Sequence, residues 1–335
     1  MLPVSIVTGF LGSGKTTLIA RLLRNPAFAR TAVIVNEFGE IGLDHELISA
    51  SDEQLLTLST GCLCCAVRAD LLATLLDLWR RRAAGEIGYD RVLIETSGLA
   101  DPAPILQALM SDRDVAQGHA IDTMVTLVDA QHGEVTLERH PEARRQVALA
   151  DRMLLSKTDL VGESEGLRGR LAGLNPGAAL LCSVAGEVAP EVMFGGCGAE
   201  VRVARLAALG DGSARLAFLA AAHSDGVETF SLVREAPVPA LALTLWLEAL
   251  VEHCGERLLR VKGLVDVAEM PGRPALIHGV RHVFSAPEWL EGWPSADRRT
   301  RVVFIGEGVP RHFPARLLEA IEGEVVDETR RQTWN

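Results

Sequence analysis

Short apolar runs alternate with amphipathic stretches along the first half of the 335-residue chain. The runs are no longer than about eight residues, and such runs are typical of strands buried on both faces of a sheet. They cover residues 4–7, 32–35, 54–58, 91–94, 121–128, 151–155 and 180–182. Stretches with helical periodicity lie between several of them, at 18–23, 71–82 and 144–149. The alternation predicts an α/β fold in which helices cover both faces of a mostly parallel sheet.

A different pattern begins after residue 226. Strand-like and helix-like stretches follow in the order β-α-β-β-β-α, at 227–234, 239–253, 258–268, 274–284, 301–305 and 315–321. This order predicts a smaller α+β domain over 226–335, joined by an Ala-, Gly- and Arg-rich linker, 196–225, to a first domain over 1–195. His278 and His282 would share one face of the strand 274–284, where a surface role is favoured over metal binding.

A Gly-rich loop follows the first predicted strand. Gly9, Gly14, Lys15 and Thr16 match the pattern G-x-x-x-x-G-K-[ST], and a helical stretch follows directly. Strand, loop and helix in this order form the setting of a phosphate-binding P-loop. Backbone N–H groups would bind phosphate oxygens, Lys15 would reach the β- and γ-phosphates, and Thr16 would ligate Mg²⁺. A turn that binds nothing is the alternative, but the chain has only three lysines and one of them stands here.

The fourth apolar run ends in Glu-Thr-Ser-Gly at residues 95–98. An acid that closes a buried strand and is followed three residues later by Gly is typical of a Walker B region. Glu95 would contact Mg²⁺ directly or through water, and the Gly98 N–H would sense the γ-phosphate. The catalytic residues expected from the sequence are therefore Lys15 and Glu95. The alternative, a helix N-terminus before Pro102, is compatible with this interpretation.

The sixth apolar run leads into Ser156-Lys157-Thr158-Asp159. This stretch resembles the N/T-K-x-D element of GTPases, in which the Asp accepts two hydrogen bonds from guanine and the Lys stem packs over the base. Ser156 stands where Asn is commoner, and it is the shorter tether. Adenine cannot supply the two donors, so GTP is favoured over ATP. The residues assigned to nucleotide binding are Gly9, Gly12, Ser13, Gly14, Lys15, Thr16, Thr17, Gly98, Ser156, Lys157 and Asp159.

Three cysteines, Cys62, Cys64 and Cys65, follow the third apolar run. In extended backbone Cys62 and Cys64 point to the same face, where thiolates would bind Zn²⁺, Co²⁺ or Ni²⁺. A closed structural zinc site takes four ligands, usually in two spaced pairs, and a second pair is not visible, which favours an exchangeable site. Redox thiols and buried inert cysteines are the alternatives. Cys65 and three residues in or just after the acidic segment 36–44 are candidates for the remaining ligand, namely Glu37, Glu40 and His45.

Composition narrows the function classes. The formal net charge of −11 argues against a nucleic-acid partner. No run of about 20 apolar residues is present, so no membrane span is expected. The first strand begins three residues from Met1, which predicts that a signal peptide is absent and that the protein is cytoplasmic. Its six cysteines are then expected to be reduced.

Together these motifs resemble the CobW-type metallochaperone GTPases, which are relatives of the HypB and UreG nickel-insertion GTPases. The stretches that carry the resemblance are 9–17, 36–44, 61–65, 95–98 and 156–159, with 258–263, 278–282 and 302–306 resembling the family's C-terminal domain. The resemblance implies a P-loop fold, Mg²⁺ and GTP as cofactors, and hydrolysis that is slow without a partner. It also implies a transition metal, most simply Zn²⁺, held at Cys62, Cys64 and Cys65 and delivered to a client metalloenzyme.

Two other functions stay open from the residues alone. One is a P-loop kinase with structural cysteines, and the other is a redox-controlled regulatory GTPase. Within the metallochaperone hypothesis, a GTP-dependent homodimer is an open assembly state. Some relatives carry a His-rich tract, whereas the nine histidines here are dispersed, so metal storage is not expected.

Overall fold

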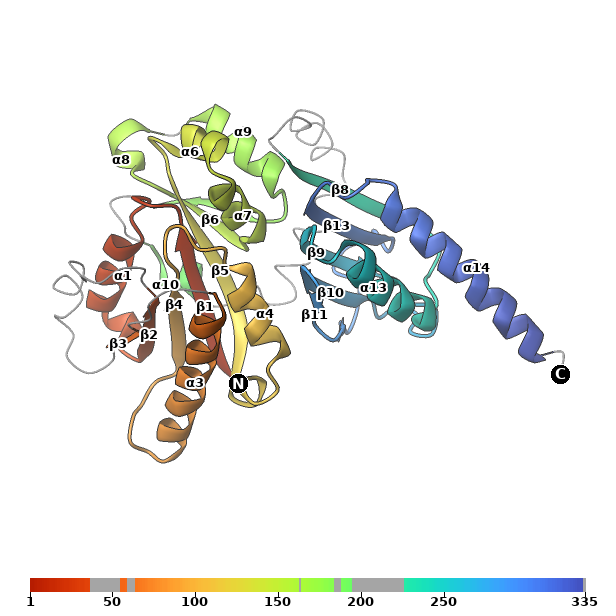
Figure 1. Ribbon diagram of the computed structural model, residues 1–335, viewed down its shortest axis with the longest axis horizontal. Helices are drawn as coiled ribbons and strands as arrows, with labels where there is room; N and C mark the ends of the chain where they lie inside the picture. The colour runs from red at the N-terminus through yellow and green to blue at the C-terminus, as the bar shows by residue number, and fades with distance from the viewer. Residues whose placement is uncertain (37–54, 59–63, 163, 184–187, 195–225, 334–335) are drawn as a thin grey trace. The chain divides into compact units, whose positions relative to one another are not determined.

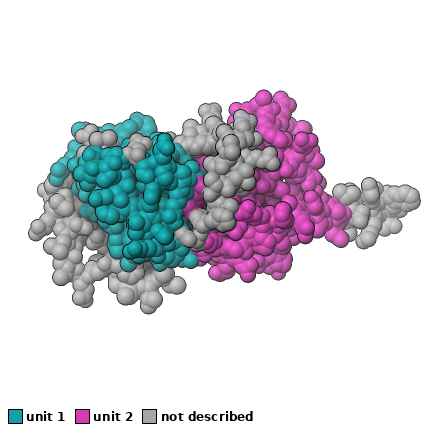
Figure 2. Space-filling view, turned by 90° about the horizontal axis from the view of Figure 1, so that it is seen from above, with its two compact units in different colours: residues 1–172, 178–197 teal, residues 173–177, 198–335 magenta. Residues whose placement is uncertain are grey.

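The computed structural model describes residues 1–36, 55–58, 64–162, 164–183, 188–194 and 226–333 (Figure 1). The predicted linker, 196–225, lies outside the described residues. The chain forms two compact units: residues 1–172 with 178–197, and residues 173–177 with 198–335 (Figure 2). No helix in the described part of the chain is both long and apolar enough to cross a membrane.

In the part of the chain that the structure describes, the first unit is built on a sheet of seven parallel strands in the order β3-β2-β4-β1-β5-β6-β7. These strands are β1 (Leu2–Gly9), β2 (Thr31–Asn36), β3 (Leu55–Leu58), β4 (Arg91–Glu95), β5 (His119–Asp129), β6 (Arg152–Ser156) and β7 (Ala179–Cys182). The accompanying helices are α1 (Lys15–Arg24), the 3₁₀ helix η1 (Pro26–Phe28), α3 (Cys64–Ala83), α4 (Ala103–Ser111), α5 (Val115–Gly118), α6 (Gly133–Arg139), α7 (Pro141–Leu149), α8 (Thr158–Val161), α9 (Glu165–Leu174) and α10 (Pro190–Met193). The predicted α/β class is confirmed.

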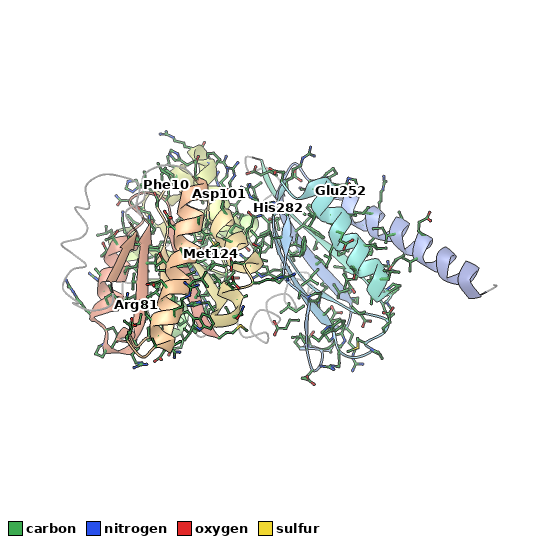
Figure 3. All side chains as sticks on the ribbon, turned by 60° about the horizontal axis from the view of Figure 1, so that its bottom comes forward. Phe10, Arg81, Asp101, Met124, Glu252 and His282 are labelled. Carbon is green, nitrogen blue, oxygen red and sulfur yellow. The ribbon has the colours of Figure 1, made fainter. Side chains whose placement is uncertain are left out.

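Helices pack on both faces of this sheet because its strands are apolar on both faces. On one face α1 buries Leu18, Ile19 and Leu22 against alternate residues of the strands, together with Met193 and Phe194. On the other face α4 and α7 contact β5, and α3 packs beside α4. Because the strands are parallel, their carboxyl ends all lie at the same edge of the sheet, which we call the carboxyl edge. Phe10 and Asp101 lie towards this edge, and Arg81 lies towards the opposite one (Figure 3).

The second unit is the expected α+β domain. Its antiparallel sheet has the order β11-β10-β9-β13-β8, with β12 paired to β10. The elements are β8 (Val227–Arg234), α13 (Ala240–Cys254), β9 (Leu258–Val265), β10 (Ala275–Val280), β11 (Val283–Phe284), β12 (Glu288–Trp289), β13 (Thr300–Glu307) and α14 (Phe313–Thr333). Both helices cover one face, where Trp246 packs edge-on against Phe304 and donates from its indole N–H to the Pro314 carbonyl, 2.8 Å away.

Several predicted elements differ from the structure, three of them in ways that change the local backbone or extend a helix by a turn or more. The prediction of a single strand over 274–284 is wrong, because the chain turns at Arg281 (φ 51°) and returns as β11. His278 and His282 therefore do not share a strand face: His278 faces Lys262 across the sheet, and His282 lies in the turn. The helix predicted at 71–82 begins earlier, at Cys64, and the helix predicted at 315–321 continues to Thr333.

A buried histidine lies at the amino end of β5. His119 is 4% exposed, and its ring stacks on that of Tyr89, whose hydroxyl lies 3.4 Å from His119 Nε2. Burial lowers the pKa of His119 to about 4, with smaller contributions from the positive charges of Arg82 and the N-terminus. The folded protein thus holds this imidazole neutral, whereas the unfolded chain protonates it near pH 6.5.

This difference predicts a pH-dependent stability. Above about pH 6.5 both states hold a neutral His119, so its contribution is constant; between about pH 6.5 and pH 4 the unfolded chain takes up a proton that the fold excludes. The free energy of unfolding should fall by about 2–3 kcal/mol across this window. His119→Gln should remove that slope in urea titrations monitored by circular dichroism.

Tyr89→Phe is the matched control, since burial is the main cause of the shift and the phenyl ring preserves it. This variant should retain most of the slope. An unchanged slope in His119→Gln would contradict the assignment.

Candidate functional site: a phosphate cradle at the carboxyl edge

The loop between β1 and α1 curls back on itself through glycines. Gly9 (φ 148°) leaves no room for a side chain, because a Cβ there would lie 2.5 Å from the Leu127 carbonyl oxygen. Gly12 and Gly14 also have positive φ, 73° and 94°. No side chain caps the N-terminus of α1. Free backbone N–H groups and the helix dipole therefore meet at this loop, which is the arrangement that binds phosphate.

Lys15 is held across the loop. Its Nζ donates to the carbonyl oxygens of Gly9 at 2.7 Å and Phe10 at 3.3 Å, and the residue is 8% exposed. These bonds keep the ammonium group beside the concave side of the loop. The charge is thus already in place for an anionic ligand, without a large rearrangement of the side chain.

The end of β4 lies directly against the loop. The Thr96 amide donates to the Val7 carbonyl at 3.0 Å, and the Thr96 hydroxyl donates to the Thr8 hydroxyl at 2.7 Å. Glu95, just before it, is 3% exposed. A Cβ on Gly98 would lie 2.8 Å from the Leu11 amide nitrogen, so only glycine permits this approach. The structure therefore places the predicted Walker B residues next to the P-loop, and Glu95 and Thr16 are the residues that would hold Mg²⁺.

The Ser-Lys-Thr-Asp stretch contacts the P-loop from the side of β6, opposite the end of β4. The Ser156 hydroxyl donates to the Ser13 carbonyl at 2.7 Å, so the shorter side chain still tethers the P-loop. Lys157 adopts a left-handed conformation (φ 59°), and α8 starts at Thr158. Asp159 is exposed in the first turn of α8 and can accept hydrogen bonds from a base.

Two polar residues near the cradle were not assigned from the sequence. Asp129, at the end of β5, accepts a hydrogen bond from Lys157 Nζ at 2.7 Å. Burial by itself raises the pKa of Asp129, but hydrogen bonds from Lys157, the Gln131 amide and His132 hold the pKa below its usual range. Gln146 on α7 donates from Nε2 to the carbonyls of Gly98 at 3.1 Å and Ala100 at 3.0 Å. The position of Asp129 after a buried strand was a visible signal, whereas nothing in the local sequence marks Gln146.

The cysteine motif is described only in part. Cys64 and Cys65 are the first two residues of α3, so the expectation of extended backbone at Cys64 is wrong. Successive helical residues lie about 100° apart around the helix axis, so the alternation argument does not apply there. Cys62, Glu37, Glu40 and His45 lie outside the described residues. Within the described ranges, no group of three or more His, Cys, Asp or Glu side chains could hold a metal ion.

Two family models match the chain. Residues 3–181 match the CobW/HypB/UreG nucleotide-binding domain, and residues 227–322 match the C-terminal domain of the cobalamin synthesis protein CobW. The chain belongs to the CobW/HypB/UreG family. The sequence-based assignment to the CobW-type GTPases is thereby confirmed.

Alignments with relatives in this family cover almost the whole chain. The zinc chaperone YjiA of Escherichia coli is 34% identical over 307 residues, covering 92% of this chain and 94% of that protein. The zinc chaperone CobW of Pseudomonas aeruginosa is 33% identical, covering 91% and 88%. The crystal structure of Zn(II)-bound E. coli YjiA GTPase superposes with a TM-score of 0.73 and 27% identity, covering 96% of this chain and 98% of that one. Both units thus have counterparts in a CobW-family protein.

The tether from Ser156 can be tested directly. Ser156→Ala removes a buried hydrogen bond to the P-loop, so the free energy of unfolding should fall by about 1 kcal/mol. The affinity for GDP should fall as well, because the Ser13 carbonyl loses the bond that fixes the loop. Urea denaturation and calorimetric titration measure the two effects.

Ser111→Ala, at an exposed residue whose hydroxyl donates only to the Gln107 carbonyl one turn back in α4, is the control and should change stability by less than about 0.5 kcal/mol. Equal GDP affinity in wild type and Ser156→Ala would show that the tether does not act on the loop.

Proposed function

We propose that this protein is a GTP-dependent metallochaperone. It binds Mg²⁺ and GTP at the P-loop and carries a transition metal at the motif Cys62, Cys64 and Cys65, with Glu37 as a further ligand. GTP hydrolysis releases the metal to a client metalloenzyme in the cytoplasm. The metal is cargo, and Zn²⁺ is the first candidate because the relatives above are named zinc chaperones. Thiolates also accept Co²⁺ and Ni²⁺, so the ligands alone do not select the metal.

The order of the parallel strands carries this proposal. Neighbouring strands β3, β2, β4 and β1 all end at the carboxyl edge. The cysteine motif follows β3, the acidic segment follows β2, Glu95 ends β4 and the P-loop follows β1. Three strand spacings of about 4.8 Å separate β3 from β1, so the strand that precedes the cysteine motif lies about 14 Å from the P-loop strand.

Each described residue then has a role towards the nucleotide. The loop amides and Lys15 bind the phosphates, while Thr16 and Glu95 hold Mg²⁺, which neutralises charge on the β- and γ-phosphates when bound. Gly98 presents its N–H to the γ-phosphate. Lys157 packs over the guanine, and Asp159 accepts two hydrogen bonds from it. No arginine in the described residues is assigned to the transition state, so hydrolysis is expected to be slow until a client or a second copy of the chain supplies the missing group.

The nucleotide and the metal are coupled in this proposal. In this proposal, the segments after β2 and β3 would close on GTP bound at the P-loop and so complete the metal site, and hydrolysis would release them. Because linkage is reciprocal, metal must tighten GTP binding by the same factor that GTP tightens metal binding.

Base selectivity provides one test. Asp159→Ala removes the acceptor for the guanine donors but leaves the phosphate cradle intact. The preference for GTP over ATP should therefore collapse, mainly through weaker GTP binding, in competition assays with a fluorescent GDP analogue. Asp77→Ala, on the exposed surface of α3, should keep the preference. A protein that never prefers GTP would instead support the kinase alternative.

Metal affinity in two nucleotide states provides the decisive test. Zn²⁺ should bind about 5- to 150-fold more tightly with Mg²⁺ and a non-hydrolysable GTP analogue than with GDP, in competition against a chromophoric chelator. Cys64→Ser should abolish the difference, whereas Cys182→Ser, at an exposed cysteine outside the motif, should preserve it. Equal zinc affinities in both nucleotide states would refute the coupling.

A further inference from the structure

The backbone turns sharply just after β4, at the residue that would meet the γ-phosphate. The Ala100 amide donates to the Ser97 carbonyl at 3.0 Å, so residues 97–100 form a β-turn with Gly98 and Leu99 at its centre. Leu99 at the tip is 53% exposed, whereas Gly98 is buried. The direction of the Gly98 amide therefore depends on the contacts that hold this turn in place.

One side chain of α7 holds the turn at two points. Gln146 Nε2 donates to the carbonyl oxygens of Gly98 at 3.1 Å and Ala100 at 3.0 Å. Gln146 is 0% exposed, so water does not compete for these bonds. Because both bonds come from one planar NH₂ group, they fix the carbonyls on either side of Leu99 relative to α7.

Gln146 is itself fastened to the sheet. Thr126 Oγ1 donates to the main-chain carbonyl of Gln146 at 2.8 Å, and Thr126 lies on β5, opposite Thr8 of the P-loop strand. One half-turn earlier in α7, Arg144 Nη1 donates to the Leu137 carbonyl at the end of α6 at 2.7 Å. The amide of Gln146 therefore starts from a fixed point beside β5, not from a freely moving helix.

The P-loop holds Gly98 from another direction. A Cβ on Gly98 would lie 2.7 Å from Leu11 Cδ2 and 2.8 Å from the Leu11 amide nitrogen. The amide and the carbonyl of Gly98 are joined through one Cα, and only two torsions relate them. When Leu11 fixes the Cα and Gln146 fixes the carbonyl, little freedom is left for the Gly98 N–H.

We infer that Gln146 is the positioning residue for recognition of the γ-phosphate. By holding the turn 97–100 against the P-loop, it directs the Gly98 N–H and so favours GTP relative to GDP. The inference rests on the proposed role of Gly98 as a donor to the γ-phosphate, and it assigns the discrimination to a residue that acts through Gly98. Because the turn is ordered beforehand, the bond to the γ-phosphate does not have to offset the entropy of fixing it.

Gln146→Met in the full-length protein tests this inference. Met keeps the length of the side chain and removes the two donated bonds, and no acceptor bond is lost because Oε1 has no partner among the described residues. With Mg²⁺ present, affinity for a non-hydrolysable GTP analogue should fall about tenfold, and affinity for GDP by less than about twofold. Competition against a fluorescent GDP analogue measures both.

Two further variants support the comparison. Gln117→Met makes the same chemical change at an exposed glutamine of α5 and should bind both nucleotides like the wild type. Gln146→Leu also lacks donors and should repeat the selective loss, so it replaces Gln146→Met should that variant not fold. Circular dichroism establishes that each variant is folded.

Hydrogen exchange of the wild type requires no variant. If Gln146 orders the turn in advance, a peptide that covers residues 96–101 should already exchange slowly with GDP bound. The GTP analogue should then slow its exchange by less than about threefold more.

Three results would overturn the inference. Equal losses of affinity for both nucleotides would give Gln146 a structural role only, and unchanged affinities would give it no role in binding. Slow exchange that appears only with the GTP analogue would show that the γ-phosphate itself orders the turn. A wild-type protein that binds neither guanine nucleotide would instead overturn the proposed function, and this inference with it.

Discussion

The P-loop depends on contacts made by its neighbours on both sides. Ser156 holds the loop through the Ser13 carbonyl, and Gly98 approaches Leu11 so closely that no side chain fits between them. A loop with several glycines loses much conformational entropy when it is fixed, and these contacts compensate for that loss before any ligand arrives. The sheet makes both contacts possible, because β4 and β5 flank β1 and β6 lies beside β5.

Much of this arrangement follows from the sequence. The apolar runs located all seven parallel strands that the described residues form, because strands buried on both faces have little freedom in composition. The strand β8 was predicted with its observed limits. The errors occur where long-range contacts decide the backbone: Arg281 takes a positive φ without being Gly, which turns one predicted strand into a hairpin, and Cys64 is already helical.

The residues of the candidate site also fall into two groups, those that the sequence indicates and those that it does not. Local motifs mark the P-loop, Glu95 and Ser156–Asp159, so the sequence alone predicts that they meet at the carboxyl edge of the sheet. Asp129 and Gln146 act through partners that are 28 and 48 residues away in the chain, Lys157 and Gly98 respectively. Such pairings depend on how α7 and β6 pack, and no local pattern encodes them. Gln146 is nevertheless central, since it connects the segment after β4 to the helix beside the P-loop.

The strand order also constrains how a metal could respond to the nucleotide. β3 is separated from β1 by β2 and β4, so the strand that precedes the cysteine motif lies about 14 Å from the P-loop strand. Direct contact between a thiolate and the γ-phosphate is therefore not the simplest route. The strands β2 and β4 lie between β3 and β1. Glu95 ends β4, and acids follow β2 in the sequence. Coupling that passes through these two segments needs each of them to have two arrangements, one for each state of the nucleotide. The bonds from Gln146 to Gly98 and Ala100 hold one end of this path in a single position, so a change at Gly98 must either break them or move α7 with it.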